Sequence, residues 1–344
     1  MQIKVMGIDI GKSTFHAVGL DEKGNIVLRK RFSRKQLLLY TANIPPCLIG
    51  MEACCGAHHL GRALATQGHQ VRLIPGQYVR PFVQNNKNDF RDAEGISEAV
   101  QRPRMHFVPL KTDEQLDLQA LHRVRDRLIS QRTALINQIR GFLLDRGLAV
   151  PKGLAKLLNL LPTILEDAEA NLSPRIREVL SDLKQECADL NQQIEAMDEK
   201  IAATAQESEI CRRLLTIPGV GPIISTAVVA AIGNGATFSK GRSFAAWLGL
   251  VPRQWSTGGK TTLLCIGKRG NPYLRKLFIL GAQSLLMHMS KNKTKSQRPY
   301  MQWLTQLAAR AHHNIVAVAL ANKIARIAWA VLNKGEVYRS PLAA

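Results

Sequence analysis

Five short apolar runs within the first hundred residues constrain the fold of this chain most strongly. They span Ile3 to Asp9, Phe15 to Leu20, Ile26 to Phe32, Cys47 to Met51 and Gln70 to Ile74. Turn signals such as the segment from Asp21 to Asn25 separate them, which is typical of β-strands. An early hairpin followed by helices predicts an α/β domain.

Acidic residues lie at or directly after the ends of two of these runs. Asp9 ends the first run, and Glu52 follows the run that ends at Met51. On neighbouring parallel strands the two carboxylates would lie side by side, where like charges repel unless a divalent cation binds between them. Two alternatives remain for Asp9, the phosphate loop of the actin and sugar-kinase ATPase fold or the start of a turn. The alternative for Glu52 is an ordinary surface residue.

A second pair of acids lies further along the chain. Asp89 and Asp92 are three residues apart and share one face of a helix, which Ala93 and Ile96 continue toward the sheet. Four acids in this order suit a two-metal site for in-line phosphoryl displacement. The alternative is helix capping, with Asp89 as the cap and Asp92 in the first turn. The nearby Cys54, Cys55, His58 and His59 lack metal-ligand spacing and are interpreted as packing or capping residues.

The positive charge of the chain is unevenly distributed. Lys and Arg number 47 against 26 Asp and Glu, which gives a formal net charge of +21. No acid occurs from Cys211 to Gly335, where about nine would be expected from the average composition. This basic region predicts a nucleic-acid partner. Its candidate contacts are Arg253, Lys260, Lys268, Arg269 and Arg275, to which Lys12 is added from the first glycine turn.

The middle of the chain has helical periodicity. One long helix is predicted from Thr112 to Gly147, and a second follows with an apolar heptad set from Leu180 to Ile201. The two helices are expected to pair as an antiparallel hairpin or a coiled-coil arm, which serves either as a packed linker or as a dimerisation or RNA-holding arm. Arg123, Arg127, Arg132 and Arg140 could hold the backbone of an RNA or a DNA duplex.

Two motifs in the basic region carry possible chemistry. The turn with Gly219 and Gly221 resembles the hairpin of a helix-hairpin-helix unit, whose backbone N–H groups can seat a phosphate; a plain turn between helices is the alternative. Ser256 and Thr257 precede a Gly-Gly turn, and a hydroxyl there could contact phosphate or act as a nucleophile. A simple loop is the alternative, and no nearby His could serve as a general base.

Asp9, Glu52, Asp89 and Asp92, together with the segment from Lys87 to Glu94, resemble the DEDD transposases of bacterial insertion sequences and the related pilin-gene invertases. The resemblance covers the whole chain. It implies a catalytic domain similar to Holliday junction resolvases, two Mg²⁺ ions, and a serine that attacks DNA to form a covalent phosphoserine. Ser256 matches that serine best, and Thr257 is second.

The resemblance also implies partners and a location. The expected partners are donor and target DNA ends, a structured bridge RNA, and further copies of the chain in a dimer or tetramer. The six cysteines form no Cys-x-x-Cys pair and fit a reducing bacterial cytoplasm, with the protein associated with the nucleoid.

The predicted fold is α/β plus α. A ribonuclease-H-like domain is expected at 1–110, a long-helix or coiled-coil arm at 111–209, and a mostly helical basic domain with the serine loop at 210–344. A transposase or recombinase is the predicted function. The rivals are a Holliday-junction-type endonuclease without a covalent intermediate, an ATPase and a non-catalytic RNA-binding protein.

Overall fold

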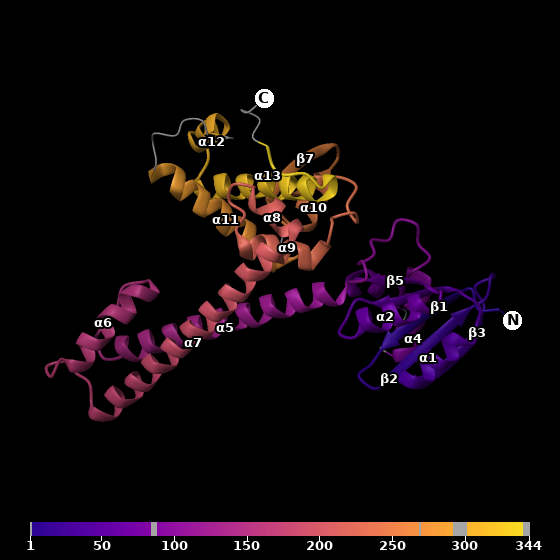
Figure 1. Cartoon of the computed structure of the whole chain (residues 1–344), viewed down its shortest axis with the longest axis horizontal. Helices are drawn as coiled ribbons and strands as arrows, with labels where there is room; N and C mark the ends of the chain where they lie inside the picture. The colour runs from indigo at the N-terminus through magenta and orange to yellow at the C-terminus, as the bar shows by residue number, and fades with distance from the viewer. Residues whose placement is uncertain (1, 84–87, 268–269, 292–300, 340–344) are drawn as a thin grey trace. The chain divides into compact units, whose positions relative to one another are not determined.

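The chain folds into two compact units, Met1–Thr112 and Asp113–Ala344. Their structure is a computed structural model that describes residues 2–83, 88–267, 270–291 and 301–339 (Figure 1). Lys87, Lys268 and Arg269, which belong to predicted motifs, lie outside the described residues. Each unit has its own hydrophobic core, and each is described by itself below.

A five-stranded mixed sheet forms the centre of the first unit. Its spatial order is β3-β2-β1-β4-β5, with β2 and β3 antiparallel to their neighbours and with β1, β4 and β5 parallel. All five predicted strands are confirmed. They span β1 (Val5–Ile10), β2 (Thr14–Leu20), β3 (Ile26–Ser33), β4 (Leu48–Glu52) and β5 (Gln70–Ile74).

Helices cover both faces of this sheet. The first face packs against α1 (Arg34–Ala42) and α2 (Ala57–Thr66), as the shared core of Ile8, Leu37 and Leu60 shows. The second face carries α3 (Gly76–Val79), the short 3-10 helix η1 (Arg80–Phe82) and α4 (Asp89–Ala99). Because successive side chains of a strand point to opposite faces, Met6 and Ile8 point to the first face and Val5, Gly7 and Asp9 to the second.

Two glycines on the second face, Gly7 and Gly50, allow α4 to pack very close to the sheet. A Cβ atom at Gly7 of β1 would lie 2.0 Å from the carbonyl oxygen of Ala93, and one at Gly50 of β4 would lie 2.7 Å from the Cβ of Val100. Any larger residue at Gly7 must therefore push α4 away from β1. The two glycines set the distance between the strand ends and the first turn of α4.

The second unit begins with a hairpin of long helices. α5 (Asp113–Leu144) and α7 (Pro174–Glu207) pair, and α6 (Leu154–Glu166) packs beside them in the same core. Arg125 forms an ion pair with Asp198, and Arg132 donates to Asn191 at 2.7 Å. The later residue on α5, Arg132, contacts the earlier residue on α7, Asn191, so the two helices are antiparallel.

The rest of the second unit is mostly helical. Its core is built around α13, where Val316, Leu320 and Ile324 are buried. Among the described helices α13 alone is long and apolar enough to cross a membrane. Half of its apolar stretch is buried inside the protein. The elements are α8 (Glu209–Leu215), α9 (Pro222–Ile232), α10 (Gly241–Trp247), β6 (Pro252–Thr257), β7 (Lys260–Ile266), α11 (Pro272–Lys291), α12 (Met301–Ala308) and α13 (His313–Lys334).

A buried histidine connects the helical hairpin to this C-terminal part. The ring of His122 on α5 lies 2.9 Å from the hydroxyls of both Thr226 on α9 and Tyr273 on α11. Burial lowers the pKa of His122 to about 4, so the ring is neutral and can donate at one nitrogen and accept at the other. The predicted division between residues 209 and 210 stays a prediction, since both sides of it belong to one compact unit.

We predict that Gly7→Ala destabilises the first unit by about 3 kcal/mol, because the added Cβ overlaps the backbone of α4. Hydrogen–deuterium exchange of the full chain should show faster exchange in β1 and α4. Gly141→Ala is the matched control, since Gly141 lies within α5 and an added Cβ there meets no atom within 4 Å. Unchanged exchange in Gly7→Ala would contradict the close packing.

Candidate functional site

Asp9 lies at the carboxyl end of β1, on the face of the sheet that α4 covers. The buried apolar residues Val5 to Ile8 precede it, so the strand holds the carboxylate in place while the carboxylate itself stays half-buried. The glycine turn at Gly11 follows and leads into β2. The strand therefore presents Asp9 at an edge that a substrate can reach.

Asp89 and Asp92 lie in the first turn of α4, directly over this edge. Asn88 is the N-cap of the helix, because its side-chain oxygen accepts from the amide of Phe90 at 3.0 Å. The capping alternative, with Asp89 as cap, is therefore wrong. Carboxylate oxygens of Asp9, Asp89 and Asp92 all lie within 4.8 Å of one another, and no other group of potential metal ligands this close occurs in the described ranges.

Burial and the neighbouring acids together set the electrostatics of Asp9. Burial raises the pKa of Asp9, and the neighbouring Asp92 and Asp89 raise it further, while His16 lowers it. Three carboxylates this close favour a bound cation, and oxygen ligands of this kind are those that Mg²⁺ and other hard divalent ions prefer. The donor set thus fits a divalent metal.

Glu52 lies next to Asp9 in the sheet but outside the three-acid group. β1 and β4 pair in parallel up to Ile8 and Met51, so Asp9 and Glu52 are the next residues on neighbouring strands. The Glu52 carboxylate packs against Gly76, where an added Cβ would lie 2.4 Å from its Oε1. It still contributes to raising the pKa of Asp9, as the last of the acids in order of effect. Its role as a metal ligand stays a prediction.

His16 is a member of the site that sequence reasoning missed. It lies on β2 directly opposite Asp9, and its Nδ1 is 3.6 Å from an oxygen of Asp89. The centroids of the His16 and Phe90 rings lie 4.8 Å apart in an edge-to-face arrangement, so His16 contacts the first turn of α4. A short hairpin between Asp9 and His16 was the available signal, since antiparallel pairing across that turn places the two residues opposite each other.

The cysteines and histidines after Glu52 have other roles. His58 accepts a hydrogen bond from the backbone amide of Lys111 at 3.2 Å, which ties α2 to the end of the first unit. Burial and the nearby Glu52 raise the pKa of Cys54, so its thiol stays protonated. No group of metal ligands in the described part of the chain includes these residues.

Ser256 and Thr257 lie on a β-strand, which corrects the predicted loop. β6 and β7 form an antiparallel hairpin, and Gly258 and Gly259 make its two-residue turn with positive φ angles of 53° and 77°. The Gly-Gly dipeptide between residues of high β-propensity was the sequence signal for this hairpin.

The two hydroxyls differ in their surroundings. The Ser256 hydroxyl accepts from the side-chain amide of Gln254 at 2.8 Å and lies 3.3 Å from the hydroxyl of Thr261. Thr257 adjoins the turn and pairs with Lys260. Every residue of β6 is exposed, so both hydroxyls are accessible.

The arginines of α5 fall into two groups. Arg132 donates to Asn191 of α7 across the helical hairpin, and Arg140 donates to the carbonyls of Pro151 and Gly153 in the connection that leads into α6. Arg123 and Arg127 are exposed on α5, where Arg127 donates to Gln131 one turn further on. The exposed pair is better placed to meet a nucleic acid.

The remaining predicted contacts are distributed over both units. Gly219 has a φ of 87° in the turn between α8 and α9, and it packs against α11 and α13 through Gly281 and Ile324. Gly221 is the N-cap of α9. Lys12, Arg253 and Lys260 are exposed, and Arg275 donates to the carbonyl of Leu248. Their contacts with nucleic acid stay predictions.

Known proteins resemble this chain along almost its full length. One family model, described as a transposase with the DEDD domain of IS110, matches residues 6–146, and the model of the transposase IS116/IS110/IS902 family matches residues 211–299. The transposase for insertion sequence element IS1328 of Yersinia enterocolitica is 44% identical over 336 residues, covering 98% of both chains. The transposase for insertion sequence element IS1111A of Coxiella burnetii is 43% identical over 337 residues, covering 98% of this chain and 92% of its own.

We predict that Asp9→Asn and Asp92→Asn raise the thermal stability of the metal-free protein, because each removes a like charge from the cluster. The same variants should lose the rise in Tm, about 2–4 °C per kcal/mol of binding, that Mg²⁺ or Mn²⁺ gives the unaltered protein. The measurement is differential scanning calorimetry with EDTA and with each metal.

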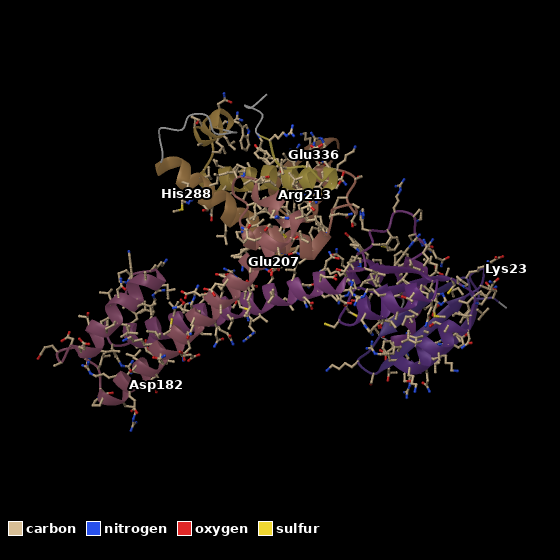
Figure 2. All side chains as sticks on the ribbon, viewed as in Figure 1. Lys23, Asp182, Glu207, Arg213, His288 and Glu336 are labelled. Carbon is tan, nitrogen blue, oxygen red and sulfur yellow. The ribbon has the colours of Figure 1, made fainter. Side chains whose placement is uncertain are left out.

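Asp182→Asn is the control, since Asp182 is exposed on α7 (Figure 2). It should keep the metal-dependent shift. A full shift in Asp9→Asn would show that these acids do not bind the metal.

Proposed function

Because this chain belongs to the IS116/IS110/IS902 family of transposases, we propose that it moves an insertion sequence by metal-assisted attack of a serine hydroxyl on DNA. The family makes the chain a DNA transposase, an enzyme whose partner is DNA and whose acidic domain uses a divalent metal. The three carboxylates within 4.8 Å of one another are the observation that carries this proposal.

In this proposal Asp9, Asp89 and Asp92 hold Mg²⁺, and Glu52 completes a two-metal set from the neighbouring strand. When bound, the metal would neutralise charge on the scissile phosphate and assist the departure of the leaving oxygen. His16 positions the first turn of α4 through its contacts with Asp89 and Phe90, so it keeps the carboxylates in register.

The proposed nucleophile is Ser256. Its Oγ loses its proton and forms a bond to phosphorus, the bond between phosphorus and one deoxyribose oxygen breaks, and that oxygen takes up a proton. The DNA strand is then joined to the protein as a phosphoserine ester, and attack by a second DNA hydroxyl reverses the step and rejoins the strands. The hydrogen bond from Gln254 supports Ser256 over Thr257, because it orients the Ser256 oxygen.

The serine and the acids belong to different units, so the proposed centre is composite. Trp255 and Leu263 of the hairpin are 65% and 66% exposed. Exposed apolar side chains around a reactive hydroxyl favour cover by another protein surface. We therefore propose that the acids of one copy act with the serine of another in a dimer or tetramer.

A structured guide RNA is proposed as a further partner. The exposed Arg123 and Arg127 lie one turn apart on α5 and could contact successive phosphates of an A-form duplex. Such an RNA would choose donor and target DNA by base pairing. The protein would then act on the nucleoid in the bacterial cytoplasm.

A structure-specific endonuclease that uses the same acids without a covalent intermediate is the second candidate. The placement of the acids favours it as much as it favours a transposase with a serine nucleophile, so the covalent step distinguishes the two. The ATPase alternative is wrong, because the family is a transposase family.

We predict that Ser256→Ala abolishes both strand exchange and the covalent protein–DNA adduct in a reconstituted reaction, at least about 100-fold, because the attacking oxygen is removed. Thr257→Ala should retain most of both. Denaturing gel analysis of labelled DNA detects the adduct. An adduct that persists in Ser256→Ala and disappears in Thr257→Ala would move the nucleophile to Thr257, and cleavage without any adduct would favour the endonuclease.

Mixing two inactive variants tests the composite centre. Asp9→Asn retains the serine and Ser256→Ala retains the acids, so a mixed oligomer contains an intact centre only if the two halves come from different copies. Recovered strand exchange in the mixture supports the proposal. Each variant alone is the control, and an inactive mixture with normal oligomers would place both halves in one copy.

We predict that RNA encoded beside the transposase gene co-purifies with the protein, and that a double substitution of Arg123 and Arg127 by Gln lowers its yield about tenfold by removing two phosphate contacts. Sequencing of the bound RNA is the measurement. Arg175→Gln, at the exposed start of α7, is the control. Bound RNA without enrichment of that region would contradict a guide role.

A further inference from the structure

Helix α13 buries one face in the core of the second unit and leaves a second, mixed face partly covered. Val316, Leu320, Ile324 and Val331 lie in the core, and Val318 and Ile327 of the second face pack at its edge. The other face consists of residues spaced by threes and fours, Ile315, Val318, Ala319, Asn322, Lys323, Arg326, Ile327 and Ala330, and Ile315 is 58% exposed. This second face is therefore suited to a binding partner.

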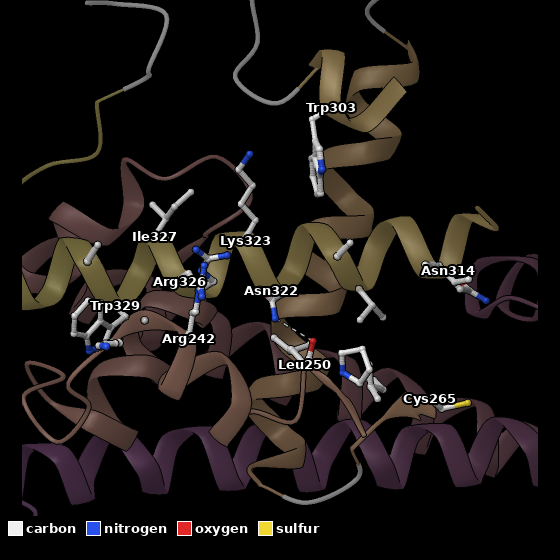
Figure 3. A pocket seen from close by; sticks show the side chains of 18 of the residues that line it. Arg242, Leu250, Cys265, Trp303, Asn314, Asn322, Lys323, Arg326, Ile327 and Trp329 are labelled. Carbon is white, nitrogen blue, oxygen red and sulfur yellow. Dashed lines mark hydrogen bonds between the residues drawn. The ribbon is translucent and has the colours of Figure 1, made fainter. Parts of the chain in front are cut away.

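The second face forms the floor of a groove of about 1400 Å³. Its walls are the segment 239–242 before and within α10, Pro252 and residues 264–266 at the base of the serine hairpin, and Trp303 of α12 (Figure 3). The hydrogen bond from Asn322 to the carbonyl of Leu250, 3.1 Å long, fixes the hairpin base against α13. The volume exceeds the roughly 300–1,000 Å³ of a typical small-molecule pocket, so the groove suits a short chain segment.

The charge of the groove has one sign. Lys240, Arg242, Lys323 and Arg326 line it, and no acidic residue occurs among its described lining residues. Burial and the nearby Arg326 lower the pKa of Lys323, which a bound anion would reverse. The Nζ atom of Lys323 also lies 4.7 Å from the centroid of the Trp303 ring. A binding partner that complements these positive charges is therefore anionic.

Apolar and aromatic surface lies beside these cations. The groove is also lined by apolar and aromatic side chains, among them Ile315, Val318, Leu264, Trp303 and Trp329. Trp329 is held in place by a 3.1 Å hydrogen bond from its indole nitrogen to the carbonyl of Gly235. Unpaired nucleotides present both a flat apolar base and a phosphate, whereas a duplex conceals the faces of its bases.

We propose that this groove binds a short unpaired stretch of a nucleic-acid strand, with its phosphates on Lys240, Arg242 and Arg326 and its bases against Ile315, Val318 and Trp303. The inference rests on the proposed function, since it takes the chain to act on nucleic acid through the hairpin that carries Ser256. The base of that hairpin is one wall of the groove, so the groove would hold the strand near the attacked phosphate. We assign the strand to DNA, because the proposed attack of Ser256 is on DNA and the base of its hairpin is a wall of the groove.

Binding of fluorescein-labelled ten-nucleotide probes to the full-length protein in EDTA is the first measurement. The probes are single-stranded DNA, single-stranded RNA of the same sequence and the DNA duplex. Ile315→Ser and Arg326→Gln should each weaken binding of the single-stranded DNA by about fivefold or more, and binding of the duplex by less than about twofold. Weakening confined to the RNA probe would overturn DNA as the occupant of the groove.

Matched controls lie outside the groove. Leu280→Ser changes an apolar residue on α11 that is 51% exposed, and Arg310→Gln removes an exposed positive charge between α12 and α13. Both should bind all probes within about twofold of the unaltered protein, and thermal melts should show that all four variants fold. Equal weakening of single strand and duplex, or no weakening in folded groove variants, would overturn the proposal.

Photocrosslinking locates the bound strand. A single strand containing 5-iodouracil should crosslink to peptides with Trp303 or residues 314–330, and Arg326→Gln should reduce the yield. Crosslinks only elsewhere would overturn the proposal, as would groove variants that change the oligomeric state and leave strand binding intact. Asp9→Asn and Ser256→Ala should bind the probes normally, so failure of the proposed chemistry is distinguishable from failure of the groove.

Discussion

The close approach of α4 to β1 is the constraint on which the acidic site depends. At Gly7 the helix backbone occupies the space that a side chain would fill, and at Gly50 the side chains of Val100 and Ile96 come nearly as close. This contact places the first turn of α4 over the carboxyl ends of β1 and β4. The carboxylates of Asp89 and Asp92 then meet Asp9, and burial together with repulsion from these two acids raises the Asp9 pKa. Packing energy from the apolar core on the second face must offset that repulsion until a cation does so.

The C-terminal part of the second unit carries almost only positive charge, in contrast to the acidic site of the first unit. It carries no acid from Cys211 to Gly335, and only a few cations of that stretch, such as Arg213 and Lys276, pair with acids from earlier in the unit. Its order comes from apolar packing around α13 and from the neutral His122, whose two hydrogen bonds connect α5 to α9 and α11. Its exposed hairpin carries hydroxyls and cations, whereas the first unit brings three carboxylates together.

Local patterns predicted the strands and long helices because periodicity depends only on which face is buried. The hairpin from β6 to β7 was missed, since its exposed strands lack alternation between buried and exposed residues, and only the Gly258-Gly259 turn signalled it. His16 was missed because its relation to Asp9 is a matter of strand register. The groove beside α13 could not be foreseen, as its walls come from segments that lie far apart in the chain.

The sequence by itself determined the chemistry that this protein can perform: acids at strand ends, a basic region without acids, and hydroxyls before a Gly-Gly turn. Side-chain type and local spacing are enough for that, because they decide which groups can bind a cation, a phosphate or a proton. Only the tertiary structure decided that Asp9, Asp89 and Asp92 meet and that Glu52 lies against Gly76. It also decided that Arg132 joins α5 to α7 and that Arg140 binds the connection after α5. Distances between groups far apart in the chain depend on how closely helices pack on the sheet and on each other, and that packing is a property of the whole core.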